Sequence, residues 1–149
     1  EALRLFRAVG ARLGEANVLK AIGDVQNFRD ERDAALQSYS EALRLFRAVG
    51  ARLGEANVYL SLGDLRREKE LEGAKKDYLQ ALEVYQTIGD RYSQARALYR
   101  LGDCYREEAD FTAALRAYEQ AADLWRQIGV HDLVESILTP RIEEARKHL

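Results

Sequence analysis

Apolar residues recur at steps of three and four along most of the chain. Between residues 33 and 49 they include Ala35, Tyr39, Ala42, Phe46 and Val49. This spacing puts them on one face of an α-helix, whereas a strand would alternate apolar and polar positions. No segment shows sustained alternation, so the pattern predicts an all-α protein.

Glycines mark the expected helix ends. Gly10, Gly50, Gly89 and Gly129 each follow an apolar run directly, as in the twice-occurring sequence LFRAVG. Because glycine enters left-handed backbone at little cost, we expect a helix to end at each of the four. Asp90, the next residue after Gly89, is expected to cap the following helix through its carboxylate.

Charged stretches at 27–33, 67–73 and 107–111 interrupt the apolar pattern once between successive glycines. The predicted helices are therefore 1–9, then the pairs 12–29 and 33–49, 52–69 and 72–88, and 91–108 and 111–128. A last helical segment is expected at 131–148. Its single proline, Pro140, is expected either to kink that helix or to lie in the first turn of a new one.

The chain also repeats itself. Residues 1–18 (EALRLFRAVGARLGEANV) recur unchanged as residues 41–58, a period of 40. A fixed period of this size indicates small units that bury their apolar faces by stacking on each other. We therefore expect one domain over 1–149, with residues 1–10 as the second helix of an incomplete repeat, repeats at 11–50, 51–89 and 90–129, and a capping segment at 130–149.

The three predicted pairs share a pattern in register. In the third pair its positions are Leu98, Leu101, Gly102, Tyr105, Ala114, Tyr118 and Ala121. The first pair has Leu19, Ile22, Gly23, Ala35, Tyr39 and Ala42, and the second has Tyr59, Leu62, Gly63, Ala74, Tyr78 and Ala81. This pattern resembles that of the tetratricopeptide repeat family. We expect Gly and Ala to let paired helices approach closely, and Tyr and Leu to fill the space between successive hairpins.

The resemblance implies a right-handed α-solenoid of tandem helical hairpins. The period exceeds the family's usual 34 residues. In this respect the chain is similar to the long-repeat branch of the family, which includes kinesin light chains, spindle-orientation adaptors and sensor arms of bacterial signalling ATPases. The second pair is one residue shorter between Gly63 and Ala74 than its neighbours, so its inter-helix turn should differ.

In this family the first helix of each pair lines the concave surface of the superhelix. Carried onto this chain, that face selects as candidate ligand-groove residues Asn17, Lys20, Asp24, Asn27, Asn57, Leu60, Asp64, Arg67, Arg96, Tyr99, Asp103 and Arg106. Family members that clamp a terminal carboxylate use Lys and Asn here, and the three Asp residues would repel such a ligand. A peptide of alternating charge suits the face better. The alternative is that Asp and Arg of adjacent repeats pair with each other.

Composition narrows the function classes. A formal net charge of −2 provides no field to attract nucleic acid or an anionic membrane. The two histidines, His131 and His148, have no metal-site or triad spacing, and Cys104 is read as a small buried residue. No glycine-rich nucleotide loop is present. We therefore expect no enzyme activity, no catalytic or metal site and no cofactor.

The sequence thus predicts a scaffold that binds a protein or peptide partner. The single cysteine and the absence of a signal-peptide pattern at the start favour the cytoplasm. One alternative is a structural or self-associating arm of a larger signalling protein, and another is an enzyme whose catalytic part lies elsewhere. Because the partner helix of 1–9 is missing from the pattern, its apolar face is also expected to support a homodimer.

Overall fold

The computed structural model describes all 149 residues, and every regular element in it is helical, which confirms the all-α prediction. The elements are α1 (Ala2–Phe28), α2 (Arg32–Val49), α3 (Arg52–Arg66), α4 (Leu71–Ile88), α5 (Arg91–Glu107), α6 (Phe111–Gln127), α7 (His131–Leu133), the π-helix η1 (Val134–Leu138) and α8 (Thr139–Lys147).

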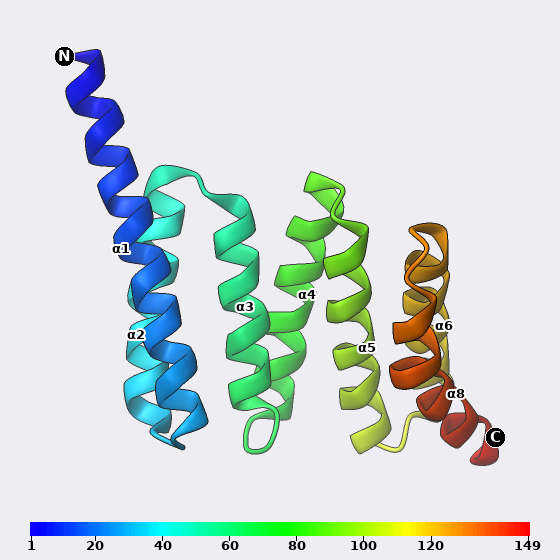
Figure 1. Ribbon diagram of the computed structural model, residues 1–149. Coiled ribbons are helices and arrows are strands. Elements are labelled where there is room, and N and C mark those ends of the chain that lie inside the picture. Colours follow the sequence, from blue (N-terminus) through cyan, green and yellow to red (C-terminus); the bar gives the residue numbers. More distant parts are fainter.

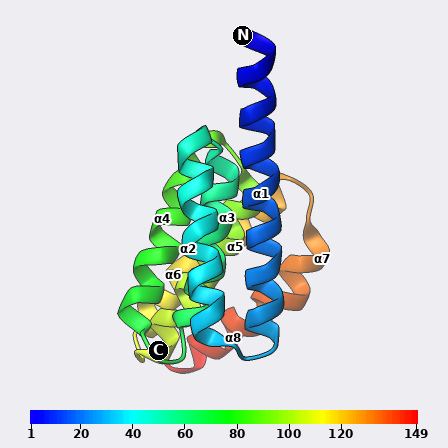
Figure 2. The same ribbon diagram turned by 90° about the vertical axis from the view of Figure 1, so that its left-hand side faces the viewer.

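The helices form two layers, as Figures 1 and 2 show. One layer contains α1, α3 and α5, which are the first helices of the three hairpins, and the other contains α2, α4 and α6. Each first helix packs on the second helix of its own hairpin, and α2 and α4 then pack on the next hairpin. The molecule is therefore an α-solenoid of tandem hairpins.

Glycine–tyrosine contacts hold each hairpin together. A Cβ added to Gly63 would lie 2.4 Å from Cε1 of Tyr78, and the same clash would occur between Gly23 and Tyr39 and between Gly102 and Tyr118. Only glycine leaves room for the ring, so the close approach expected at these glycines is confirmed. Each ring thus lies on the glycine of its own hairpin, and Tyr39 and Tyr78 also belong to one buried cluster that continues into the following hairpins.

Three of the four predicted helix ends are confirmed. Gly50, Gly89 and Gly129 adopt φ angles of +71°, +76° and +79°, the left-handed region where a side chain is strained. Asp90 caps α5 as expected, since its carboxylate accepts a hydrogen bond from the Ser93 amide at 3.0 Å.

The predicted end at Gly10 is wrong. Helix α1 continues through it, so residues 1–9 are not a separate helix. The same sequence turns at Gly50, where the Phe46 ring lies against Gly54, but nothing lies within 4 Å of a Cβ at Gly14, and Phe6 is 78% exposed. No neighbouring helix is present that a turn at Gly10 could pack against. A continuous helix is therefore more stable here, because it keeps the backbone hydrogen bonds that a turn would break.

The turns inside the hairpins differ as predicted. Asp30 in the first hairpin and Ala109 in the third have positive φ angles of 62° and 61°. The second hairpin is one residue shorter here and has no positive-φ residue in its turn. Its helix α3 ends at Arg66, and residues 67–70 make the connection to α4.

Pro140 lies in the first turn of α8, one of the two predicted outcomes. The π-helix η1 connects α7 to α8 without a break, and Val134, Leu138 and Ile142 from this segment pack into a buried cluster with Trp125 of α6. A second, larger cluster extends from α1 to α5. The C-terminal segment therefore covers the apolar face of the last hairpin.

Candidate functional site: a charged face on the first-helix layer

The twelve predicted groove residues lie on α1 and α3, at Arg67 directly after α3, and on α5. Ten of them are exposed or half-buried. Leu60 is only 3% exposed and belongs to the core, which removes it from the surface of the predicted groove. Asp103 is 1% exposed, so its carboxylate contacts the surrounding side chains and is not open to a ligand.

The three aspartates of this face have one role in common. Each accepts a hydrogen bond from the tyrosine of the second helix in the same hairpin. The pairs are Asp24 with Tyr39 at 2.7 Å, Asp64 with Tyr78 at 2.6 Å and Asp103 with Tyr118 at 2.6 Å. The Gly-Asp sequence thus places the glycine under the ring and the carboxylate at its hydroxyl.

The same environment keeps the phenols protonated. Burial, followed by the neighbouring Asp24, raises the pKa of Tyr39 above its usual range. Burial and Asp64 do the same to the pKa of Tyr78, and burial and Asp103 to the pKa of Tyr118. All three hydroxyls therefore remain hydrogen-bond donors to a higher pH than an exposed tyrosine would.

Arginines of the following elements join these carboxylates across repeats. Arg100 donates through Nε to Oδ1 of Asp64 at 3.0 Å. Arg141 of α8 forms a two-pronged pair with Asp103, Nε to Oδ1 at 2.8 Å and Nη2 to Oδ2 at 3.1 Å. Arg67 also approaches Asp103, at 3.4 Å. The alternative of Asp–Arg pairing between repeats thus describes Asp64 and Asp103.

Arg100 and Arg141 were missed by the sequence reasoning. They lie 36 and 38 residues after the aspartates they bind, close to one repeat period. A full period of 40 residues after the two aspartates lie Cys104 and Glu143, so the repeat period alone does not find these arginines. Asp24 has no such partner, because Leu60 lies 36 residues after it; its carboxylate pairs instead with Lys20 of its own helix at 2.9 Å.

Tyr99 lies at the centre of the charged face. The guanidinium carbons of Arg100 and Arg141 are 4.9 Å and 5.0 Å from its ring centroid. A cavity of about 270 Å³ opens here, lined by Asp64, Arg67, Tyr99, Arg100, Asp103 and Arg141. A neighbouring hollow of about 310 Å³ shares Asp64 and Arg67 and continues toward the first hairpin, lined also by Asn27, Asp30, Arg32, Leu65, Glu68 and Lys69.

Charges of opposite sign alternate along this face. Arg67 pairs with Glu107 at 3.4 Å as well as with Asp103. Arg106 lies 3.8 Å from Glu144 and 4.0 Å from Asp103. The outer carboxylates of Glu107 and Glu144 are 38% and 53% exposed, so water competes for them and a ligand group could replace them.

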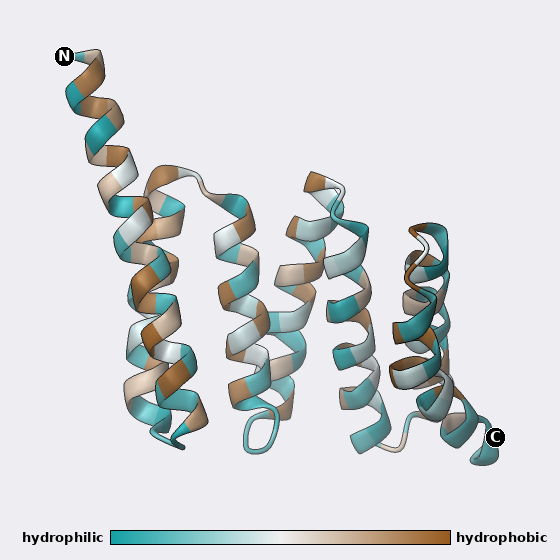
Figure 3. Cartoon of the chain, viewed as in Figure 1, coloured by the Kyte–Doolittle hydropathy of each residue, from teal (hydrophilic) through white to brown (hydrophobic).

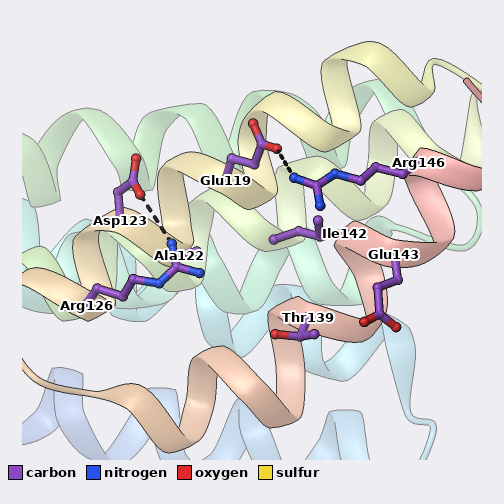
Figure 4. Close-up of a pocket in the computed structure, with 8 residues that line it drawn as sticks. All are labelled: Glu119, Ala122, Asp123, Arg126, Thr139, Ile142, Glu143 and Arg146. Carbon is purple, nitrogen blue, oxygen red and sulfur yellow. Dashed lines mark hydrogen bonds and ion pairs between the residues drawn. The ribbon is translucent and has the colours of Figure 1, made fainter.

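A separate hollow of about 350 Å³ lies between α6 and α8 and contains none of the predicted residues. Figure 4 shows its two ion pairs, Glu119 with Arg146 at 3.0 Å and Asp123 with Arg126 at 3.4 Å. These charges are satisfied within the chain.

The residues considered for chemistry are accounted for structurally. Cys104 is buried, and that burial raises the pKa of its thiol to about 12. His148 stacks on Phe111 with ring centroids 4.0 Å apart, and His131 is exposed. No group of three or more His, Cys, Asp or Glu side chains is arranged to hold a metal ion. None of the helices combines the length and apolar character needed to span a membrane.

Comparison with known proteins agrees with this architecture. Residues 54–127 match the tetratricopeptide repeat family model. The chain is a tetratricopeptide repeat protein. Repeats of this family generally mediate protein–protein interaction. A search of curated protein sequences gives no significant match.

Two solved structures have similar folds. The N-terminal domain of stress-induced protein-1 (STI-1) from C. elegans aligns with a TM-score of 0.69 and 16% identity, over 93% of this chain and 97% of that one. BtubC (BKLC) from P. vanneervenii aligns with a TM-score of 0.66 and 18% identity, over 90% of this chain and 60% of that one. At these identities the likeness concerns the fold.

Proposed function

We propose that this protein is a non-enzymatic scaffold that binds a peptide segment of a partner protein along the charged face of α1, α3 and α5. In the family this layer is the concave side of the superhelix. The observation that carries the proposal is the alternation of guanidinium and carboxylate groups around the Tyr99 cavity, from Asp64 to Glu144.

This alternation favours a peptide that itself alternates in charge. Arg67 and Arg106 each hold one exposed glutamate, and a ligand carboxylate could take its place by a charge-assisted hydrogen bond. A ligand Lys or Arg could in turn pair with the released Glu107 and Glu144. The buried pair of Asp103 and Arg141 would remain in place as a support.

A peptide-binding assay tests this proposal. Three fluorescent peptides of equal length serve as probes, one of alternating Glu and Lys, one of Lys only and one of Ser and Gly. We expect anisotropy to detect binding of the alternating peptide alone, and the affinity to fall as salt is added because the contacts are exposed.

The matching variant is Arg67→Gln with Arg106→Gln, which removes both guanidinium groups without setting a new carboxylate beside Asp103. Its control is Arg44→Gln with Arg116→Gln, two exposed arginines of the other layer that form no ion pair. We expect the first variant to weaken binding at least tenfold, roughly the effect of losing one charge-assisted bond, and the control to leave it unchanged. Equal losses in both would remove the groove from consideration.

A second candidate function is a self-associating structural arm, and the long apolar face left exposed on α1 favours it. For either function we propose the cytoplasm as the compartment, because the buried Cys104 thiol needs no disulfide partner. Membership of the long-repeat branch is likewise a proposal, supported by the 40-residue period.

A further inference from the structure

Helix α1 exposes apolar positions that the next repeat buries. Val18, Ile22 and Val25 are 59%, 42% and 51% exposed, whereas Val58, Leu62 and Leu65, 40 residues later, are 0%, 4% and 8% exposed. The difference arises because α2 packs on α3, while no helix of the structure packs on the corresponding side of α1. Figure 3 shows hydrophobic bands along the part of α1 that projects beyond the other helices.

The duplicated block shows what such a face binds. In its second copy, residues 41–58, the chain turns at Gly50 so that the end of α2 packs on the start of α3. The Phe46 ring lies against Gly54, and Nε of Arg47 lies 3.4 Å from Oε1 of Glu55. These contacts join the two halves of one 18-residue block.

In the first copy the same two halves lie in one continuous helix and cannot reach each other. Phe6 is 78% exposed, no atom lies within 4 Å of a Cβ at Gly14, and neither Arg7 nor Glu15 has an ion-pair partner. The block therefore carries two complementary halves, both unsatisfied within the chain. A second copy of the chain can satisfy both of them at once.

We propose that α1 pairs antiparallel with α1 of a second copy, with a two-fold axis near Gly10. Moving the observed contacts back by the 40-residue period places Phe6 on Gly14 of the partner subunit and Arg7 beside Glu15 of the partner subunit. Symmetry repeats both contacts. The pair is thus a domain exchange in which the turn seen at Gly50 is opened into a straight helix.

The helix surface fits this arrangement. Phe6, Gly10 and Gly14 are four residues apart, so they lie along one stripe of α1. Gly14 leaves room for the opposing phenylalanine ring, as Gly54 does for Phe46. The first turns of α1 stand clear of the rest of the molecule in Figure 1, so a second copy can approach them. This inference rests on the self-associating function and is independent of the peptide groove.

Sedimentation equilibrium of the whole chain provides the first test. We expect a concentration-dependent dimer of twice the 17.0 kDa chain mass. Gly14→Leu should raise the dissociation constant by about tenfold or more, because its side chain occupies the space of the partner's Phe6. It should not impair folding, since the space at Gly14 is empty in the single chain. Arg12→Gln, at an exposed position on the side of α1 opposite to the stripe of Phe6, Gly10 and Gly14, should leave the dimer unchanged.

A charge exchange separates pairing between two chains from a fold-back within one chain. Arg7→Glu and Glu15→Arg should each weaken self-association, because each sets like charges together. Mixed in equal amounts, the two variants should form a heterodimer in which both pairs are again complementary. Fold-back onto the same chain cannot produce this rescue.

Three outcomes would overturn the proposal. They are a monomer throughout the micromolar to millimolar range, a dimer that Gly14→Leu does not weaken, and a mixture of the two charge variants that associates no better than either alone. Peptide binding, measured separately on a monomeric sample of Gly14→Leu, would remain interpretable in each case.

Discussion

At the scale of single residues, the Gly-Asp pairs do more than the sequence pattern alone indicates. The glycine leaves room for the tyrosine ring, and the aspartate accepts a hydrogen bond from the hydroxyl of that ring at 2.6–2.7 Å. In the second and third hairpins the same carboxylate also receives an arginine from the next element. One short motif therefore joins the two helices of a hairpin, and in the second and third hairpins the same carboxylate also joins that hairpin to the next element.

Ala109 offers a test of backbone strain. Its φ of 61° lies in the left-handed region, which costs a residue with a Cβ about 1–2 kcal/mol. Ala109→Gly removes that cost while adding some unfolded-state entropy, so we expect a net gain of about 0.5–1 kcal/mol in the free energy of unfolding. Urea denaturation measures it. The same replacement in mid-helix, Ala21→Gly, should instead lose about 1 kcal/mol, and a loss at both positions would contradict the strain argument.

At the scale of elements, the sequence predicted most helices to within a few residues. Most helix ends are marked by nearby residues, namely glycines, charged turns and a lapse in apolar periodicity. It failed at Gly10 because that boundary is not local. The same 18 residues turn when α2 and α3 pack together and remain straight when nothing packs on them. Arg141 was missed for a related reason, since its partner Asp103 is far away in the sequence and the contact depends on how α8 docks.

The two glycines of the duplicated block provide a matched experiment. Gly50→Ala should destabilise the protein by about 1–2 kcal/mol, because a Cβ is strained at a φ of +71°. Gly10→Ala, in an identical local sequence, should stabilise α1 by up to about 1 kcal/mol, since alanine is the better helix former. Denaturation monitored by circular dichroism gives both signs, and a loss of stability in the Gly10 variant would mean that the chain turns there too.

At the scale of the whole molecule, hydrogen-bonded phenols in all three hairpins couple stability to alkaline pH. The pKa of Tyr39, Tyr78 and Tyr118 is raised in the folded state by burial and by an aspartate, so the folded protein holds these protons more tightly than the unfolded chain does. Their contribution to the free energy of unfolding is fully present below the ordinary tyrosine pKa of 10.0, and it is lost as the pH rises above that value.

We therefore expect the melting temperature to fall steeply above about pH 10. Tyr78→Phe should make that fall shallower, because one of the three groups no longer titrates. Melting curves recorded from pH 8 to 11 measure the slope, about the range in which free tyrosine ionises. Tyr92→Phe, at an exposed ring for which no aspartate bond exists, is the control and should leave the slope as it is.

The position of Trp125 has a practical consequence for how unfolding is observed. It is the only tryptophan, and it belongs to the C-terminal cluster formed by α5, α6 and the segment from α7 to α8, whereas the larger cluster runs from α1 to α5. Helical arrays can lose their weaker end first. Tryptophan fluorescence therefore reports on the C-terminal cluster, whereas far-ultraviolet ellipticity measures the helix content of the whole chain. We expect the ellipticity transition to begin at lower urea than the fluorescence transition, and coincident curves would show that the two clusters unfold as one.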